Sequence, residues 1–153
     1  MQLVTFLCSA NFYRSRFAEH LFNHLAPAAG IPWRADSRGL RVGFWGDVGA
    51  ISEFTVDALQ ARGIAVEAEP RYPIPLTLAD LVKSHLVVAV KEVEHRAMVQ
   101  EQFPDWVDTV EYWDVDDIDC ATPDEALEYL EHRVRALIER LQQSAACPRS
   151  EVA

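Results

Sequence analysis

The sequence of 153 residues contains few cysteines, only Cys8, Cys120 and Cys147. An odd, scattered set argues against a disulfide framework and favours a reducing compartment. No two of them have the short spacing typical of zinc ligands. A chain of this length buries about 70% of its unfolded surface, so we expect its core to hold the fold without disulfides or metal. We predict one domain over residues 1–143 and a frayed tail over 144–153.

The sequence also lacks a long apolar stretch. No run approaches the ~18 apolar residues that a membrane span requires, and the N-terminus has neither the basic start nor the apolar segment of a signal peptide. Positive charge is scarce as well, because 14 Lys and Arg face 24 Asp and Glu, which gives a formal net charge of −10. These absences predict a cytoplasmic protein that binds neither nucleic acid nor membrane.

The little positive charge that exists is concentrated near the start of the chain. Residues 1–50 contain five arginines and three acidic residues, which gives them a net charge of +2. Because the whole chain carries −10, residues 51–153 carry −12. We expect an anionic ligand to be drawn to the first of these two parts.

Apolar patterning alternates between the two regular periods. Apolar runs predict strands over residues 2–7, 33–37, 85–90 and 107–113, with a weaker run at 64–67. Helical spacing predicts helices that begin near residues 15, 52, 77, 91 and 122, of which the first is ended by Pro27 and Gly30 and the last ends at Gln143. This alternation predicts an α/β fold of three layers, a central four-stranded parallel sheet with helices on both faces.

The loop after the first predicted strand has a cysteine at one end and an arginine at the other. Cys8 and Arg14 enclose five residues, and Ser15 opens the next helix. A loop that leads into a helix start presents several backbone N–H groups to one point, and the helix dipole adds positive potential there. The Arg14 fork matches two oxygens of an oxyanion, and the same potential favours thiolate over thiol. The pattern predicts a nucleophile beneath a bound phosphate; an inert, buried Cys8 is the alternative.

The stretch LCSANFYRSRFAEHLF resembles the signature of the low-molecular-weight protein tyrosine phosphatases, Cys-x-Gly-Asn-x-Cys-Arg-Ser followed by a helix. Cys8, Asn11, Arg14 and Ser15 match that signature. Further on, Ser37 in ADSRG, the strand HLVVAV and the segment WDVDDID resemble later family motifs, and the last of these puts the family's general acid at Asp117. The resemblance spans residues 2 to about 142 and implies a flavodoxin-like strand order.

The resemblance implies a two-step phosphoryl transfer. Cys8 attacks phosphorus while Asp117 protonates the leaving aryl oxide, and water then hydrolyses the phosphocysteine with Asp117 as the base. Arg14 and the loop amides hold the phosphate oxygens. The implied partners are a phosphorylated protein or a small aryl phosphate, and phosphate-like oxyanions. No metal or organic cofactor is implied.

The resemblance also assigns binding and support residues. Ser15 donates to the thiolate, and Asn11 holds the loop. Phe44 and Trp45 form a pocket wall against a phenyl ring, for which a hydrophobic plug over the sheet is the alternative. Ser37 supports the loop. The full set of predicted binding residues is Ser9, Ala10, Asn11, Phe12, Tyr13, Ser15, Phe44 and Trp45.

Several positions depart from the family pattern. Ala10 replaces a glycine and is strained if its φ is positive, Tyr13 replaces a second cysteine, and Ile118 replaces a proline. Arg16 also replaces a proline and is expected to add charge beside the pocket mouth. The family's histidine has no counterpart near Arg71.

These departures leave two alternatives open, an arsenate reductase coupled to an external thiol and a phosphate-binding pseudo-phosphatase. The aspartates at 114, 116, 117 and 119 leave a cation site or an ordinary acidic loop open as well.

Overall fold

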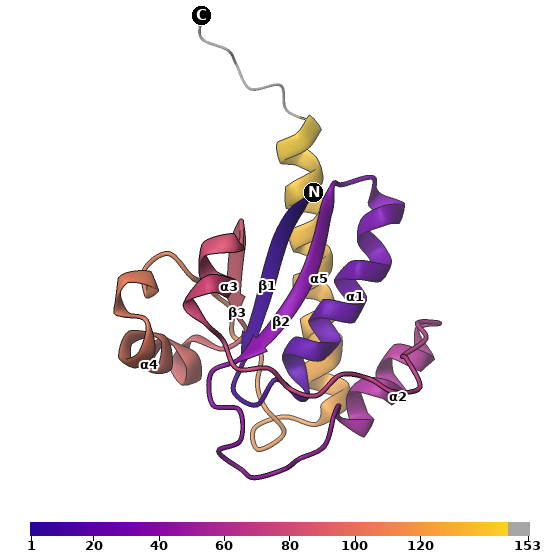
Figure 1. The fold of residues 1–153 in the computed structure, drawn as a ribbon. Helices are drawn as coiled ribbons and strands as arrows, with labels where there is room; N and C mark the ends of the chain where they lie inside the picture. The colour runs from indigo at the N-terminus through magenta and orange to yellow at the C-terminus, as the bar shows by residue number, and fades with distance from the viewer. Residues whose placement is uncertain (147–153) are drawn as a thin grey trace, which may run out of the picture.

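The structure, a computed structural model, describes residues 1–146 and contains a parallel sheet of four strands (Figure 1). The strands lie in the order β2-β1-β3-β4, which confirms the predicted three-layer, flavodoxin-like fold. Their bounds are β1 Gln2–Cys8, β2 Trp33–Gly39, β3 Leu86–Ala89 and β4 Glu111–Tyr112. The helices are α1 Arg14–Ala29, α2 Glu53–Ala61, α3 Leu78–Lys83, α4 Glu92–Gln102 and α5 Pro123–Ala146, with a 3-10 turn, η1, at Pro104–Trp106.

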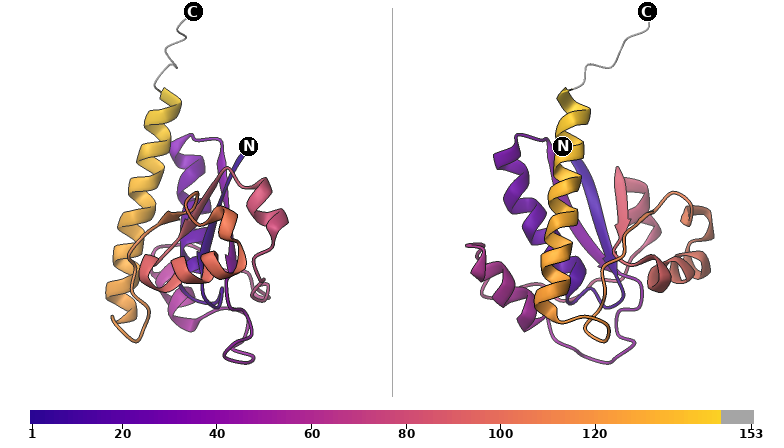
Figure 2. Two further views of the ribbon diagram at one scale, coloured as in Figure 1. Left: turned by 90° about the vertical axis from the view of Figure 1, so that its left-hand side faces the viewer. Right: turned by 180° about the vertical axis from the view of Figure 1, so that it is seen from behind.

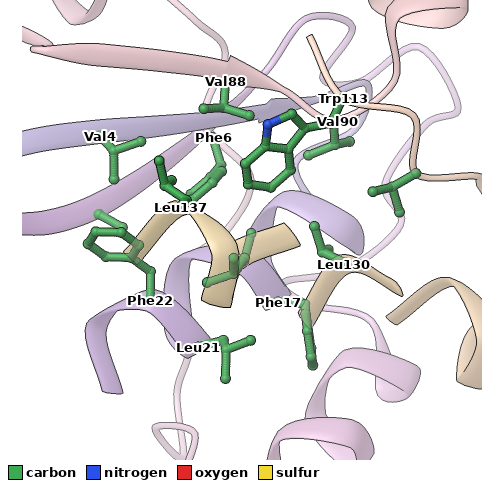
Figure 3. Packing of buried hydrophobic residues seen from close by; sticks show 14 of the residues in the cluster. Val4, Phe6, Phe17, Leu21, Phe22, Val88, Val90, Trp113, Leu130 and Leu137 are labelled. Atoms are coloured by element: carbon green, nitrogen blue, oxygen red, sulfur yellow. The ribbon is translucent and has the colours of Figure 1, made fainter. Parts of the chain in front are cut away.

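Two hydrophobic clusters cover the two faces of the sheet. Phe6 of β1 and Val88 of β3 pack against α1 and α5, together with Trp113 (Figure 3). Leu7 and Ala89, the next residues of the same strands, pack on the opposite face against α3 and α4. Figures 1 and 2 show these two helix layers on either side of the sheet. Because the central strands are buried on both faces, they read as continuous apolar runs in the sequence.

The end of α1 and the start of α3 are both set by the chemistry of a few residues. Pro27 lies inside α1 and does not end it, whereas Gly30, the other predicted end residue, follows Ala29 with φ 70° and its N–H closes the last turn. A proline in the last turn removes one intrahelical hydrogen bond, the one that its own missing N–H would donate. Glycine, by contrast, adopts the left-handed conformation after the helix without strain. At α3 the predicted capping box is present, since the Thr77 and Asp80 side chains each accept from the other's backbone N–H.

Two strand predictions and the predicted tail need correction. Residues 64–67 form no strand, and only Glu111 and Tyr112 of the run 107–113 pair with β3. Helix α5 continues to Ala146, three residues beyond its predicted end, so residues 144–146 are helical. The rest of the predicted tail, 147–153, lies outside the described residues. Within residues 1–146, no helix combines the length and the apolar character that crossing a membrane requires.

The sheet brings three connecting segments to one edge. The carboxyl ends of β1 and β2 point toward the lower part of Figure 1, where the loops after them run beside the segment that leads into α5. Gly39, the last residue of β2, lets the loop after β1 lie close to the end of β2, since a Cβ on Gly39 would lie only 2.9 Å from the Ser9 carbonyl oxygen. In parallel sheets this edge is where ligands bind.

Candidate active site

The loop between β1 and α1 places Cys8 and Arg14 at the carboxyl edge of the sheet. Cys8 is only 3% exposed, and its Sγ lies 2.9 Å from Ser15 Oγ. The N-terminus of α1 has no side-chain cap, so no N-cap side chain takes up its first amides. The Arg14 side chain is 2% exposed and donates to the Val115 carbonyl at 3.0 Å. A thiol, a helix start and a guanidinium therefore converge at one place.

A buried amide holds this loop in shape. Asn11 is fully buried and, at φ 53°, is the only non-glycine residue with positive φ among residues 1–146. Asparagine tolerates this conformation better than most residues. Its Nδ2 donates to Ser15 Oγ and to Ser37 Oγ, both at 2.9 Å. The strained position is thus Asn11, and the strain considered for Ala10 does not arise.

Arg71 is a supporting residue that the sequence analysis missed. Its guanidinium donates to Asn11 Oδ1 at 3.0 Å, to the Ser37 carbonyl at 3.0 Å and to Glu19 Oε1 at 3.1 Å. Residues 68–76 show no helical or strand periodicity, so no sequence pattern pointed to this contact.

Asp117 lies across the pocket from the loop. Its side chain is 39% exposed, and Oδ2 lies 3.3 Å from Arg14 Nη2. The neighbouring aspartates turn elsewhere: Asp114 accepts from the Tyr129 hydroxyl at 2.6 Å, and Asp116 pairs with Lys91 at 3.0 Å. Among residues 1–146 no group of three or more His, Cys, Asp or Glu is arranged to hold a metal ion.

One cavity of about 450 Å³ joins these residues. Cys8, Arg14 and Asp117 all line it, and its remaining walls are largely apolar. The other residues of its lining are Ser9, Ala10, Phe12, Tyr13, Trp45, Val48, Ser52, Phe54, Glu94, Ile118 and Asp119.

Not every predicted binding residue reaches this cavity. Asn11 and Ser15 are fully buried and do not line it, and the same holds for Ser37, which was predicted only to support the loop. Phe44 is 66% exposed and does not line the cavity, although its ring packs edge-on against Trp45, 5.0 Å between centroids. Of the predicted aromatic pair, only Trp45 is therefore in the wall, and Phe54 at the start of α2 is a wall residue that the sequence analysis missed.

Two departures from the family pattern have structural roles. Arg16 is 1% exposed and lies away from the pocket mouth, contrary to expectation; it donates to the carbonyls of Ala50 and Arg71 at 2.7 and 3.0 Å. It thereby fastens two long loops to α1. Tyr13 is buried, and burial, followed by the charge of Asp117, raises its pKa to about 12. Its hydroxyl stays protonated at neutral pH.

Glu94 is the third residue of the site that the sequence analysis missed. Its carboxylate accepts from Arg14 Nη2 at 2.9 and 3.2 Å and from Nη1 at 3.2 Å. Burial opposes ionisation of Glu94, but hydrogen bonds from His95, Arg14 and Ser9 and the Arg14 charge lower its pKa well below the usual range. For Arg14, burial favours the neutral form, but Cys8 and Glu94 raise its pKa further than burial lowers it. Both groups of this pair are charged at neutral pH.

Comparison with known proteins agrees with this architecture. Residues 3–146 match the family described as low molecular weight phosphotyrosine protein phosphatase. No curated protein matches the sequence. A mutant of YwlE from Bacillus subtilis shares 25% identity at a TM-score of 0.78, over 93% of this chain and 99% of that chain.

Two further solved structures have the same fold. A low molecular weight protein tyrosine phosphatase from T. tengcongensis has 25% identity and a TM-score of 0.74, covering 94% of this chain and 99% of that chain. Wzb from Vibrio vulnificus, solved in complex with benzylphosphonate, has 15% identity and a TM-score of 0.76, covering 91% and 98%. With the family match over nearly its whole described length, this chain belongs to the low molecular weight phosphotyrosine protein phosphatases, a family of hydrolases.

Proposed function

We propose that this protein hydrolyses aryl phosphate monoesters, on phosphorylated proteins or small molecules, through a phosphocysteine on Cys8. The observation that carries the proposal is that one cavity is lined by a thiol, a guanidinium and a carboxyl group, those of Cys8, Arg14 and Asp117. These are the nucleophile, the oxyanion-binding group and the proton donor that two-step phosphoryl transfer requires.

In the first step, Cys8 Sγ attacks phosphorus and the bond from phosphorus to the aryl oxygen breaks. The Ser15 hydroxyl, 2.9 Å from Sγ, supports this role because it can donate a hydrogen bond to the thiolate. Asp117 gives its proton to the leaving oxygen. In the second step, water attacks the phosphocysteine, Asp117 takes its proton, and inorganic phosphate and the Cys8 thiolate are released.

The charged groups around Cys8 stabilise the transferring phosphoryl group. The buried Arg14 guanidinium and the uncapped start of α1 offer fixed donors in a partly dry site, where they need no reorganisation as charge develops. Asn11 and Arg71 support them by fixing the loop. Phosphoryl transfer depends mainly on such positioning and charge stabilisation.

The apolar walls favour an aryl leaving group. Phe12, Trp45, Phe54 and Ile118 line the cavity that contains Cys8. A phenyl ring buries its faces against such side chains, whereas a small hydrophilic alcohol gains little there. The proposed setting is the cytoplasm, since a nucleophilic thiol requires reducing conditions.

The test is hydrolysis of p-nitrophenyl phosphate by the full chain and by Cys8→Ser. We expect the variant to lose turnover while it keeps its melting temperature and still binds phosphate. Cys120→Ser is the matched control, because Cys120 is an exposed cysteine outside the cavity, and it is expected to keep full activity. Undiminished hydrolysis by Cys8→Ser would refute the proposal.

A phosphate-binding protein without turnover is the second candidate. The departures from the family pattern at Ala10, Tyr13, Arg16 and Ile118 motivate it, and all of these except Arg16 line the cavity with Cys8. Calorimetric binding of phosphate together with no turnover of any aryl phosphate would decide for this candidate. Arsenate reduction coupled to an external thiol stays an untested alternative, and thiol-dependent production of arsenite is its readout.

A further inference from the structure

The carboxylate of Glu94 occupies the donors that an oxyanion at Cys8 needs. Glu94 extends from the first turn of α4 into the cavity lined by Cys8. Both of its oxygens accept from Arg14 Nη2, at 2.9 and 3.2 Å, and Oε1 also accepts from the Ser9 hydroxyl. Ser9 belongs to the loop that is proposed to hold phosphate, so Glu94 bridges two parts of the oxyanion site.

Both terminal nitrogens of the Arg14 guanidinium already have hydrogen-bond partners. Nη1 donates to the Val115 carbonyl at 3.0 Å, which fixes the guanidinium plane from behind. The other contacts of Nη1 and Nη2 are with Glu94, and Nη2 also lies 3.3 Å from Asp117 Oδ2. A guanidinium has two edges with parallel N–H groups, Nη1 with Nη2 and Nε with Nη2, and Glu94 occupies the first of them. A phosphate on either edge uses Nη2, the nitrogen that both Glu94 oxygens contact.

A bound phosphate and the Glu94 carboxylate cannot both contact Arg14 Nη2 without strong repulsion. Hydrogen bonds and the Arg14 charge keep Glu94 ionised at neutral pH, and like charges at contact distance disfavour each other. The Glu94 side chain is 24% exposed, so it has a path out of the cavity toward solvent. Binding of phosphate therefore weakens or breaks the contact between Glu94 and Arg14.

We propose that Glu94 is an internal competitor of the phosphate group and determines how tightly this site binds dianionic oxyanions. The inference rests on the proposed function, because it takes the loop at Cys8 as the oxyanion site. In the absence of phosphate, Glu94 keeps the buried guanidinium paired. Displacing Glu94 costs part of the free energy that a phosphate gains at Arg14. Phosphate therefore binds more weakly than it would to the same loop without the Glu94 carboxylate.

The test is the dissociation constant of inorganic phosphate, measured by calorimetry at pH 7 on the full chain and on Glu94→Gln. A hydrogen bond to a charged group contributes about 1.5–3 kcal/mol, so we expect the variant to bind phosphate roughly 10- to 100-fold more tightly. With p-nitrophenyl phosphate, the same variant should show a lower KM, and its KM should change by a larger factor than its kcat. A purely structural role of Glu94 would not produce tighter binding.

The matched control is Glu92→Gln. Glu92 lies on the same helix turn, outside the cavity with Cys8, and its exposed side chain contacts Arg96 at 3.4 Å. This variant removes the same unit of charge and is expected to bind phosphate as the unchanged protein does. Equal tightening in both variants would mean that net charge, not competition at Arg14, sets the affinity, and would overturn the inference.

The remaining outcomes separate this inference from the proposed function. Phosphate binding that is unchanged or weakened in Glu94→Gln overturns the competitor role, while binding to the unchanged protein still supports the oxyanion site. Absence of phosphate binding in all variants overturns both. If Glu94→Gln fails to fold, Glu94→Asp is measured instead: its carboxylate is one methylene shorter and bridges Arg14 and Ser9 less well, so affinity should still rise. Unchanged or weaker binding by Glu94→Asp overturns the inference as well.

Discussion

The guanidinium of Arg71 and the amide oxygen of Asn11 lie 3.0 Å apart, which ties the loop after β1 to a segment 60 residues further along the chain. The other side of the Asn11 amide holds Ser15 and Ser37. Arg71 thus acts on the loop only through Asn11 and its neighbours. It is a positioning residue, and its loss should disturb the loop more than the fold.

We expect Arg71→Ala to lower kcat on p-nitrophenyl phosphate by roughly 10- to 100-fold, since charged hydrogen bonds contribute about 1.5–3 kcal/mol each. Arg71→Lys should recover only part of this loss, because an ammonium cannot reproduce the planar fork. Alkylation of Cys8 by iodoacetate gives a second readout: phosphate should protect Cys8 less well in Arg71→Ala.

The control for Arg71 is Arg135→Ala, which removes one positive charge from an exposed face of α5, where Arg135 pairs with Glu131. This variant should keep the kcat of the unchanged protein. Wild-type kcat together with normal phosphate protection in Arg71→Ala would contradict the positioning role.

Asp117→Asn is expected to slow turnover at least ~100-fold, because a positioned proton donor contributes about 10²–10⁴-fold to such reactions. The loss should shrink with aryl phosphates whose leaving groups are more acidic, since these leave without a proton. Steady-state kinetics over a series of substituted phenyl phosphates measures both effects.

Asp116→Asn is the matched control for the general acid. Asp116 is the adjacent carboxylate, but it pairs with Lys91 and lines a different cavity. Equal losses in the two variants would show that the charge of this segment matters and that a specific proton donor does not.

The sheet and most helices could be predicted because their signals are local. The continuous apolar run of β1 and the capping box at Thr77 depend on residues a few positions apart. Strand β4 was overestimated, because the apolar residues of 107–113 partly fill the core beside η1 instead of pairing with β3. Apolar content alone does not show whether a residue pairs with the sheet or packs in the core beside it.

The candidate site was predictable only where one motif carries it. Cys8, Arg14 and Ser15 stand within eight residues, whereas Arg71 and Glu94 meet the loop through contacts between residues 60 to 85 positions apart. Glu94 reads in the sequence as one of several charges on a solvated helix. Only the crossover between parallel strands brings it over Arg14, and no periodicity encodes that meeting.

The aromatic wall predicts a difference between two exposed phenylalanines. Phe54 lines the cavity with Cys8, whereas Phe44 lies outside it. We expect Phe54→Ala to raise KM for p-nitrophenyl phosphate about 10-fold, since a buried aromatic contact contributes ~0.5–1.5 kcal/mol beyond its area, and to leave the affinity for inorganic phosphate unchanged. Phe44→Ala should change KM much less. If Phe44→Ala raised KM more than Phe54→Ala does, the aryl group would have to contact Phe44, which contradicts the prediction.

His95 predicts how stability depends on pH. The ring is fully buried on α4; Nδ1 accepts from the Lys91 N–H at 3.1 Å, and Nε2 lies 3.1 Å from Ser9 Oγ. Burial lowers its pKa, Arg14 lowers it further, and the carboxylates of Glu94 and Asp117 only partly oppose this. The folded protein therefore holds His95 neutral at a pH where the unfolded chain already binds a proton.

The sign follows from this difference in proton binding. His95 contributes stability that is fully present above its unfolded pKa of about 6.5 and is lost as the pH falls through the lower folded pKa. Melting temperatures between pH 8 and 5 should decline less steeply in His95→Gln than in the unchanged protein. His132→Gln, at an exposed position of α5, should decline as the unchanged protein does. Parallel curves for His95→Gln and the unchanged protein would mean that His95 has the same pKa in the folded and unfolded states, which contradicts the prediction.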